Sequence, residues 1–227
     1  MKDVTFLLPA YNEERSIGTL ITRIQRLYPR SQIVVINNKS TDRTVEIAKT
    51  YGVQVIHENN QGKGYAVRKG FNNVESEIVV MFDADNTYNP NDANKLIKCL
   101  NEDRADLVLG NRLNGKKEKG SISTLNIIGN HILSFTATLL YSKISDVCTG
   151  FWVFKKDVIQ YYNDEGLNST GFELEVEMFI KASEGNFRIK EVPVTYKNRV
   201  DSPKLNSLKD GWRIFKTLWI NKLNIDY

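Results

Sequence analysis

The first 110 residues alternate short apolar runs with segments of helical periodicity, and this alternation limits the fold more than any other feature. Apolar and β-branched residues dominate the runs at 4–8, 33–36, 53–57, 78–82 and 106–109. After the first run, which we expect to end at Pro9, Ile17, Leu20, Ile21 and Ile24 recur at the spacing of one helix face. Strands that alternate with helices of this length predict an α/β fold, in which a parallel sheet has helices on both faces.

Polar clusters follow four of the predicted strands. These clusters are Tyr11-Asn12-Glu13, Asn37-Asn38, residues 59–63 and Asp83-Ala84-Asp85. In an open parallel sheet, ligands bind in the crevice outside the carboxyl ends of the strands. We therefore expect the four clusters to meet in one active-site crevice.

Two aspartates, Asp83 and Asp85, come directly after the apolar run 78–82. Hard carboxylate oxygens suit Mg²⁺ or Mn²⁺, and the diphosphate of a nucleotide would complete the coordination shell. The metal would neutralise the charge that develops on the leaving diphosphate. Two aspartates in an isolated turn are more often a solvated acidic turn. Their position at the end of a central strand favours the metal site here.

The chain beyond residue 110 is organised differently. Residues 111–121 are rich in Gly, Lys and Asn, so we expect a mobile flap. An amphipathic helix is predicted from the apolar residues Leu125, Ile128, Ile132, Phe135 and Leu139, and strand 151–154, helix 172–183 and strand 187–196 follow. With no linker in view, we predict one domain over 1–227, divided into residues 1–110, residues 111–200 and a tail at 201–227.

The tail carries an apolar stripe bordered by cations. The stripe comprises Leu205, Leu208, Trp212, Phe215 and Trp219, and Lys209, Arg213 and Lys216 lie beside it. Such a stripe is typical of a helix that lies in a membrane surface, although most amphipathic stripes pack on a protein core. The two tryptophans favour contact with a membrane, so we predict peripheral attachment.

Composition excludes several classes of protein. A hydrophobic content of 41% and a charged content of 26% are ordinary for a globular protein, and a net charge of +4 gives no indication of a nucleic-acid partner. Cys99 and Cys148 form no disulfide framework, which favours a reducing cytoplasm. The apolar segment 127–140 is too short and too polar to span a bilayer, and we expect no signal peptide.

Seven motifs occur in the order and spacing of family 2 glycosyltransferases. They are Leu8-Pro9-Ala10-Tyr11-Asn12-Glu13-Glu14, Ser40-Thr41-Asp42-Arg43-Thr44, Gly62-Lys63-Gly64, Asp83-Ala84-Asp85, Gly110-Asn111-Arg112, Asp146-Val147-Cys148-Thr149-Gly150-Phe151 and Glu191-Val192-Pro193-Val194. The chain most resembles the branch that transfers a sugar to a polyprenyl or dolichyl phosphate. The resemblance implies a GT-A fold, which is a Rossmann-like, mixed and mainly parallel sheet, followed here by amphipathic C-terminal helical segments.

The resemblance makes residues 1–110 the nucleotide-sugar-binding half and residues 111–200 the acceptor half, and it also assigns the donor-binding residues. It implies that Pro9, Ala10, Tyr11 and Glu13 line the base and ribose pocket, and that Ala84 belongs to the substrate-binding set. Asn37 and Asn38 stand where relatives usually carry two acids. The amide oxygen of Asn38 could accept a hydrogen bond from a pyrimidine N3–H, but the two asparagines could equally shape a turn.

The donor prediction depends on the residues after the two aspartates. The mannosyltransferases of this group usually carry a Gln there, and this chain has Asn86-Thr87-Tyr88. That departure favours a UDP-sugar, such as UDP-glucose or UDP-GlcNAc, over GDP-mannose. Lys63 follows a glycine and is expected to reach the diphosphate or the sugar of the donor.

Three further residues are assigned to catalysis and to the acceptor side. Arg112 offers fork-shaped donors to the acceptor phosphate or the donor diphosphate, with a salt bridge as the structural alternative. Asp146 is expected to face the acceptor, as a base or as an organiser, and with Arg112 and Asp85 it completes the predicted catalytic set. Glu175 matches a family glutamate near the acceptor, but Glu173 and Glu177 compete for that role.

We predict an inverting transferase that moves a sugar from a UDP-sugar to a polyprenyl or dolichyl phosphate at the cytoplasmic face of a membrane. A homo-oligomer is left open. One alternative is a GT-A enzyme that extends a saccharide, which predicts no membrane affinity. Another is an inactive nucleotide-sugar-binding scaffold, against which the two aspartates, Arg112 and Asp146 argue. A dinucleotide-dependent dehydrogenase would need a GxGxxG after the first strand, and there is none.

Overall fold

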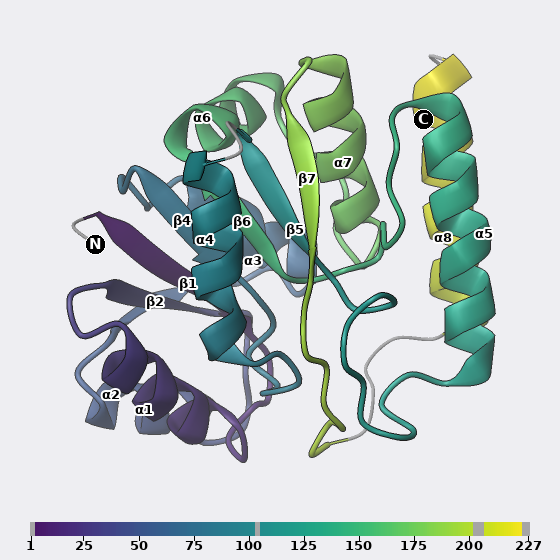
Figure 1. Cartoon of the computed structure of the whole chain (residues 1–227). Coiled ribbons are helices and arrows are strands. Elements are labelled where there is room, and N and C mark those ends of the chain that lie inside the picture. Colours follow the sequence, from purple (N-terminus) through teal and green to yellow (C-terminus); the bar gives the residue numbers. More distant parts are fainter. Residues whose placement is uncertain (1–2, 103–104, 202–206, 224–227) are drawn as a thin grey trace.

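The computed structural model describes residues 3–102, 105–201 and 207–223, and within them seven strands form one sheet (Figure 1). The strand order is β3-β2-β1-β4-β6-β5-β7. The strands are β1 (Val4–Ala10), β2 (Gln32–Asn37), β3 (Gln54–His57), β4 (Ile78–Met81), β5 (Leu107–Asn111), β6 (Trp152–Lys155) and β7 (Ile189–Pro193). Every strand pair is parallel except the two that involve β6. The predicted mixed, mainly parallel sheet is confirmed.

The single antiparallel strand positions part of the crevice. β6 lies between β4 and β5, and its first residue, Trp152, pairs with Met81 near the end of β4 and with Leu109 near the end of β5. An antiparallel strand begins where its parallel neighbours end. The loop that precedes β6, residues 145–151, therefore lies at the same edge of the sheet as the aspartates after β4.

Helices cover both faces of the sheet, as predicted. The helices are α1 (Ile17–Leu27), α2 (Thr44–Thr50), α3 (Lys63–Phe71), a short 3₁₀ turn η1 (Pro90–Asp92), α4 (Ala93–Glu102), α5 (Thr124–Leu140), α6 (Lys156–Glu165), α7 (Leu174–Glu184) and α8 (Ser207–Leu223). Side chains of β1 alternate between two cores: Phe6 and Leu8 pack with α1 and α4, and Leu7 packs with α3, α6 and α7. This alternation follows from the two-residue period of a strand.

Several local predictions need correction. Helix α6 was not predicted, and β1 continues through Pro9 to Ala10 instead of ending at Pro9. Pro9 is tolerated because β4 pairs with β1 only as far as Leu7, so one side of β1 has no ladder there. The predicted strand at 187–196 is confined to 189–193, because the chain then leaves the ladder and Tyr196 bonds to the backbone of Lys116 and Glu118.

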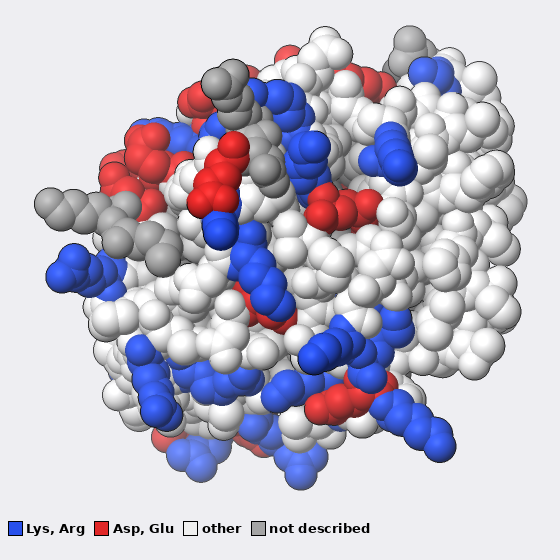
Figure 2. Space-filling view, viewed as in Figure 1, with Lys and Arg blue, Asp and Glu red and all other residues white. Residues whose placement is uncertain are grey.

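Helix α5 turns its apolar stripe outward. Leu125, Ile128, Ile132, Phe135 and Leu139 are all more than half exposed, whereas Asn130 and Ser134 are buried. The inner face also carries Leu133 and Ala137, which pack in the core, and its two polar side chains bond to the loop before β6. Figure 2 shows that the side of the molecule where α5 lies has a broad area with few charged side chains.

Helix α8 packs beside α5 through Ile214 and Leu218, which are almost fully buried. Of the predicted stripe, Leu208, Trp212 and Trp219 are exposed, and Leu205 lies outside the described residues. Phe215 is partly buried against the core, so the stripe is only partly turned away from it. None of the helices in the described ranges combines the length and apolarity that crossing a bilayer requires.

Candidate active site

One cavity of about 1270 Å³ collects the predicted binding residues. Its lining includes every member of the predicted substrate-binding set: Pro9, Ala10, Tyr11, Glu13, Asn38, Lys63, Asp83, Ala84, Asp85, Arg112 and Glu175. These residues come from the ends of β1, β2, β4 and β5 and from the starts of α3 and α7. The carboxyl ends of the strands therefore form one crevice. Asp146 is not among the lining residues.

Lys63 joins two carboxylates at one end of the crevice. Its Nζ lies 2.5 Å from Asp83 Oδ1 and 2.5 Å from Glu175 Oε1. Burial lowers the pKa of Lys63, but the two carboxylates outweigh that effect and hold it above its ordinary value. A side chain on Gly64 would collide with the Ser169 carbonyl oxygen. This glycine therefore allows α3 to approach the loop before α7 closely enough for Lys63 to contact Glu175.

Asp85 is held by its own turn and by a distant arginine. Its Oδ1 accepts hydrogen bonds from the backbone N–H (3.0 Å) and the hydroxyl (2.6 Å) of Thr87. Its Oδ2 lies 2.7 Å from Nη2 of Arg199, and another Arg199 contact reaches Glu13 at 3.6 Å. Burial and then the Asp83 carboxylate raise the pKa of Asp85.

Arg199 is the site residue that the sequence analysis missed. It follows β7, which runs parallel to β5, so it stands beyond the carboxyl end of a strand like the four predicted clusters. The same rule, applied to the last strand, would have identified it.

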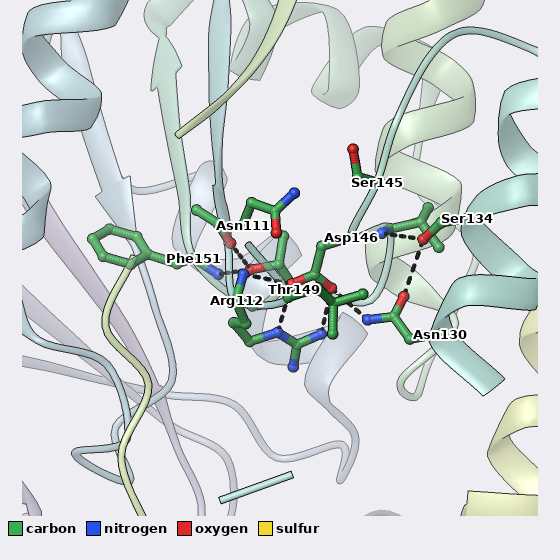
Figure 3. A network of polar contacts seen from close by, with 12 residues as sticks. Asn111, Arg112, Asn130, Ser134, Ser145, Asp146, Thr149 and Phe151 are labelled. Carbon is green, nitrogen blue, oxygen red and sulfur yellow. Dashed lines mark hydrogen bonds and ion pairs between the residues drawn. The ribbon is translucent and has the colours of Figure 1, made fainter. Parts of the chain in front are cut away.

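Arg112 and Asp146 form a buried ion pair (Figure 3). Asp146 Oδ2 accepts from the backbone N–H and Nε of Arg112, and Oδ1 accepts from Arg112 Nη2 and Asn130 Nδ2. Burial raises the pKa of Asp146, but Arg112 and Asn130 outweigh it and hold the pKa below its usual value. Asp146 is fully buried, and its contacts with Arg112 orient that side chain from behind the cavity wall.

The loop before β6 is held in place by Glu191. Its Oε1 accepts from the backbone N–H of Asp146 and from Asn111, and its Oε2 accepts from the backbone and hydroxyl of Ser145. The Arg112 side chain therefore rests on a network anchored in both β5 and β7.

Asn38 is engaged with the loop that precedes α3. Its Oδ1 accepts from the backbone N–H of Gly62 (2.7 Å), and its Nδ2 donates to the carbonyl of Asn60 (2.7 Å). The oxygen that we expected to read a base thus has a backbone partner, which favours the turn-shaping alternative. Asn37 likewise bonds to the backbone of Ser40 and to the ring of His57.

The structure separates the three competing glutamates. Glu173 accepts from the backbone N–H groups of Thr170 and Gly171, and Glu177 accepts from those of Asn168 and Ser169. Both therefore shape the loop before α7. Glu175 alone of the three lines the cavity, where it meets Lys63.

The cavity continues away from the aspartates as an apolar groove between α5 and α8. Its lining there includes Leu125, Ile132 and Leu133 of α5 together with Leu208, Trp212 and Phe215 of α8. One connected space therefore has a charged end and an apolar end.

A model of the family described as Glycosyl transferase family 2 matches residues 5–162. The chain belongs to this family. The low-salt glycan biosynthesis hexosyltransferase Agl6 of Haloferax volcanii is 34% identical over 223 residues, which are 96% of this chain and 53% of that protein. The chain thus spans about half the length of that relative. A dolichyl-phosphate hexose transferase of the same organism is 30% identical over 217 residues, covering 95% of this chain and 92% of that protein.

A solved structure shows the same fold as this glycosyltransferase. The glucosyl-3-phosphoglycerate synthase from Mycobacterium tuberculosis, in complex with Mn²⁺, uridine diphosphate and its product, matches with a TM-score of 0.78. The match covers all of this chain and 81% of that chain at 18% sequence identity. The predictions of a GT-A fold and of a family 2 glycosyltransferase are confirmed.

The two aspartates of the glycosyltransferase fit a divalent ion. Both residues line the cavity, and each carboxylate forms an ion pair with a cation, Asp83 with Lys63 and Asp85 with Arg199. No group of three or more His, Cys, Asp or Glu suited to a metal occurs in the described ranges. Asp83 and Asp85 would therefore hold the ion together with oxygens from a bound diphosphate.

Proposed function

We propose that this glycosyltransferase transfers a sugar, with inversion at the anomeric carbon, from a UDP-sugar to a polyprenyl or dolichyl phosphate. The observation that carries the proposal is the cavity, which joins polar strand ends to an apolar groove between α5 and α8. A lipid phosphate has matching chemistry, because a charged headgroup is attached to a long hydrocarbon chain. The name of the H. volcanii relative, a dolichyl-phosphate hexose transferase, supports this class of acceptor.

The donor half of the proposal rests on the turn after the aspartates. Thr87 is buried and donates its hydroxyl to Asp85, so it supports a metal ligand rather than adding one. This arrangement differs from the Gln that the resemblance associates with mannosyltransferases. The complex of the structural neighbour with uridine diphosphate and Mn²⁺ supports a UDP-sugar and a divalent ion.

The residues of the cavity divide the reaction between them. Asp83 and Asp85 would hold a divalent ion, whose charge would stabilise the departing diphosphate. Arg112, fixed by Asp146, presents a guanidinium to the phosphate of the acceptor or of the donor. A phosphate monoester loses its second proton near pH 6, so the attacking oxygen is largely ionised at neutral pH and needs no general base. Positioning and charge stabilisation supply most of the catalysis.

The exposed apolar face supports peripheral attachment to a membrane. Phe135 and Leu139 of α5 are 70% and 71% exposed, and Leu208 and Trp212 of α8 are 76% and 63% exposed. Clustered apolar side chains on a protein surface mark a binding surface. Lys209, Arg213 and Lys216 are exposed on α8 and would meet anionic headgroups. The groove between the two helices opens within this face, where a lipid acceptor would enter.

Removing apolar side chains from this face is expected to release the protein from membranes. Full burial of a Phe or Leu side chain contributes about 1.5–3 kcal/mol, so two substitutions on one helix should weaken binding at least about tenfold. The variants are Phe135→Ser/Leu139→Ser on α5 and Trp212→Ala/Trp219→Ala on α8. Co-sedimentation with anionic liposomes at low salt measures the bound fraction.

The matched control is Leu27→Ser/Tyr51→Ser, which removes two exposed hydrophobic side chains, one at the end of α1 and one directly after α2, and should leave the bound fraction unchanged. Wild-type protein that stays in the supernatant would contradict membrane attachment and favour a saccharide acceptor. Equal losses in the control and in the α5 and α8 variants would show that this face is not the docking surface.

A further inference from the structure

Each aspartate of the Asp83–Asp85 pair already carries a cation supplied by the protein. Lys63 Nζ lies 2.5 Å from Asp83, and Arg199 Nη2 lies 2.7 Å from Asp85. The Asp85 side chain is 3% exposed, so Arg199 contacts a carboxylate that is almost sealed from solvent. These are the carboxylates that the proposed function assigns to a divalent ion, and the inference below rests on that assignment.

Both cations have a second carboxylate within ion-pair distance. Lys63 also contacts Glu175 at 2.5 Å, and Arg199 also contacts Glu13 at 3.6 Å. A buried charge that loses its only partner is strongly destabilising. Lys63 and Arg199 can each leave an aspartate without that loss of stability, because each keeps a glutamate as its partner.

The charges of this cluster match one divalent ion. Four carboxylates (Glu13, Asp83, Asp85 and Glu175) face two cations (Lys63 and Arg199), which leaves an excess of two negative charges. Within the described residues, Glu175 Oε2 and Arg199 Nε are buried atoms without a hydrogen-bond partner, so both side chains can accept a changed arrangement. A divalent ion on the aspartates, with each cation on its glutamate, would balance the cluster.

We propose that metal binding in this protein is an exchange, in which Arg199 leaves Asp85 for Glu13 while Lys63 is retained by Glu175. Arg199 is then a built-in competitor of the metal, and Glu13 is the residue that receives it. Two like charges a few ångströms apart repel each other in a partly buried site, so the ion and Arg199 compete for Asp85. Metal affinity should therefore rise when Arg199 loses its charge and fall when Glu13 loses its charge.

The test is the affinity of the full chain for Mn²⁺, measured by calorimetry with Mn²⁺ alone and with Mn²⁺ plus uridine diphosphate. Arg199→Gln is expected to bind Mn²⁺ alone about tenfold more tightly than wild type, and Glu13→Gln about tenfold more weakly. The matched control is Arg15→Gln. It breaks the ion pair between Arg15 and Asp201 (3.1 Å), two residues beyond Arg199, without touching the aspartates. Its Mn²⁺ affinity should stay within about twofold of wild type, since exposed pairs contribute little.

Opposite shifts in the two variants cannot be imitated by a general loss of structure. If Arg199→Gln binds Mn²⁺ no more tightly than wild type while both bind Mn²⁺ with uridine diphosphate, the exchange is overturned and the proposed function stands. If Arg199→Gln does not fold, a wild-type Mn²⁺ affinity in Glu13→Gln overturns the exchange by itself. If wild type binds no Mn²⁺ even with uridine diphosphate, the metal site of the proposed function is overturned as well.

Discussion

Replacing Asp85 by asparagine is expected to lower kcat by about a thousandfold or more, which corresponds to ~4 kcal/mol of transition-state stabilisation. The carboxylate lies in the turn after the central strand β4, lines the cavity and is oriented by Thr87, so its loss removes a ligand of the proposed ion. An amide of the same size fills the same buried volume, and Arg199 keeps its contact with Glu13. The melting temperature should therefore stay within about 4 °C of wild type, or roughly 1 kcal/mol.

Asp164→Asn serves as the control, because Asp164 is an exposed carboxylate on α6. It should retain wild-type turnover. Wild-type activity in Asp85→Asn, or unchanged wild-type activity in excess chelator, would be incompatible with the metal site.

Replacing Asp146 by asparagine is expected to lower kcat by about a hundredfold without changing the shape of the pH–rate profile. The amide cannot accept every hydrogen bond that Arg112 and Asn130 donate to the carboxylate, so the guanidinium loses its fixed orientation. Breaking a buried ion pair also costs about 3–5 kcal/mol of stability. Measurements below the melting temperature of the variant separate the two effects.

The shape of the profile distinguishes an organiser from a base. Arg112 holds the pKa of Asp146 below its usual value, so Asp146 is ionised on both sides of neutrality and contributes no acid limb between about pH 5 and 8. A limb near pH 6 from the acceptor phosphate should be present in both proteins. An acid limb that disappears only in Asp146→Asn would show that Asp146 acts as a general base.

The crevice was predictable because its main residues obey one rule of α/β sheets. Asp83, Asp85 and Glu13 directly follow parallel strands, and such strands end at one edge. Arg112 follows the same rule through β5. Lys63 was predictable as a cation after a flexible glycine, although its contact with Glu175 was not. That contact depends on how α7 packs near α3, and local sequence carries no information about such packing.

Other features depend on long-range structure. The apolar spacing of α5 predicted a helix, but periodicity cannot tell which face is buried. Asn130 and Ser134 are buried because they form hydrogen bonds with the loop before β6. Periodicity does not indicate such a partner. The role of Asn38 could not be predicted either, because its two backbone partners lie more than twenty positions further along the chain. Arg199 reaches Asp85 only because β7 joins the sheet beside β5.

The most direct test of the proposed function is a transfer assay on a lipid acceptor. The protein would be incubated with Mn²⁺ and radiolabelled UDP-glucose, UDP-GlcNAc or GDP-mannose. Each donor would be offered to vesicles with or without polyprenyl phosphate and, separately, to soluble saccharides. The label extracted into organic solvent and the anomeric configuration of the product would be measured.

We predict that a UDP-sugar labels the lipid phosphate in the vesicles, that the product has the inverted anomeric configuration, and that GDP-mannose gives little or no product. The label should depend on polyprenyl phosphate and should be lost in Asp85→Asn. Transfer to soluble saccharides with none to polyprenyl phosphate would contradict the proposed function and establish the saccharide-extending alternative.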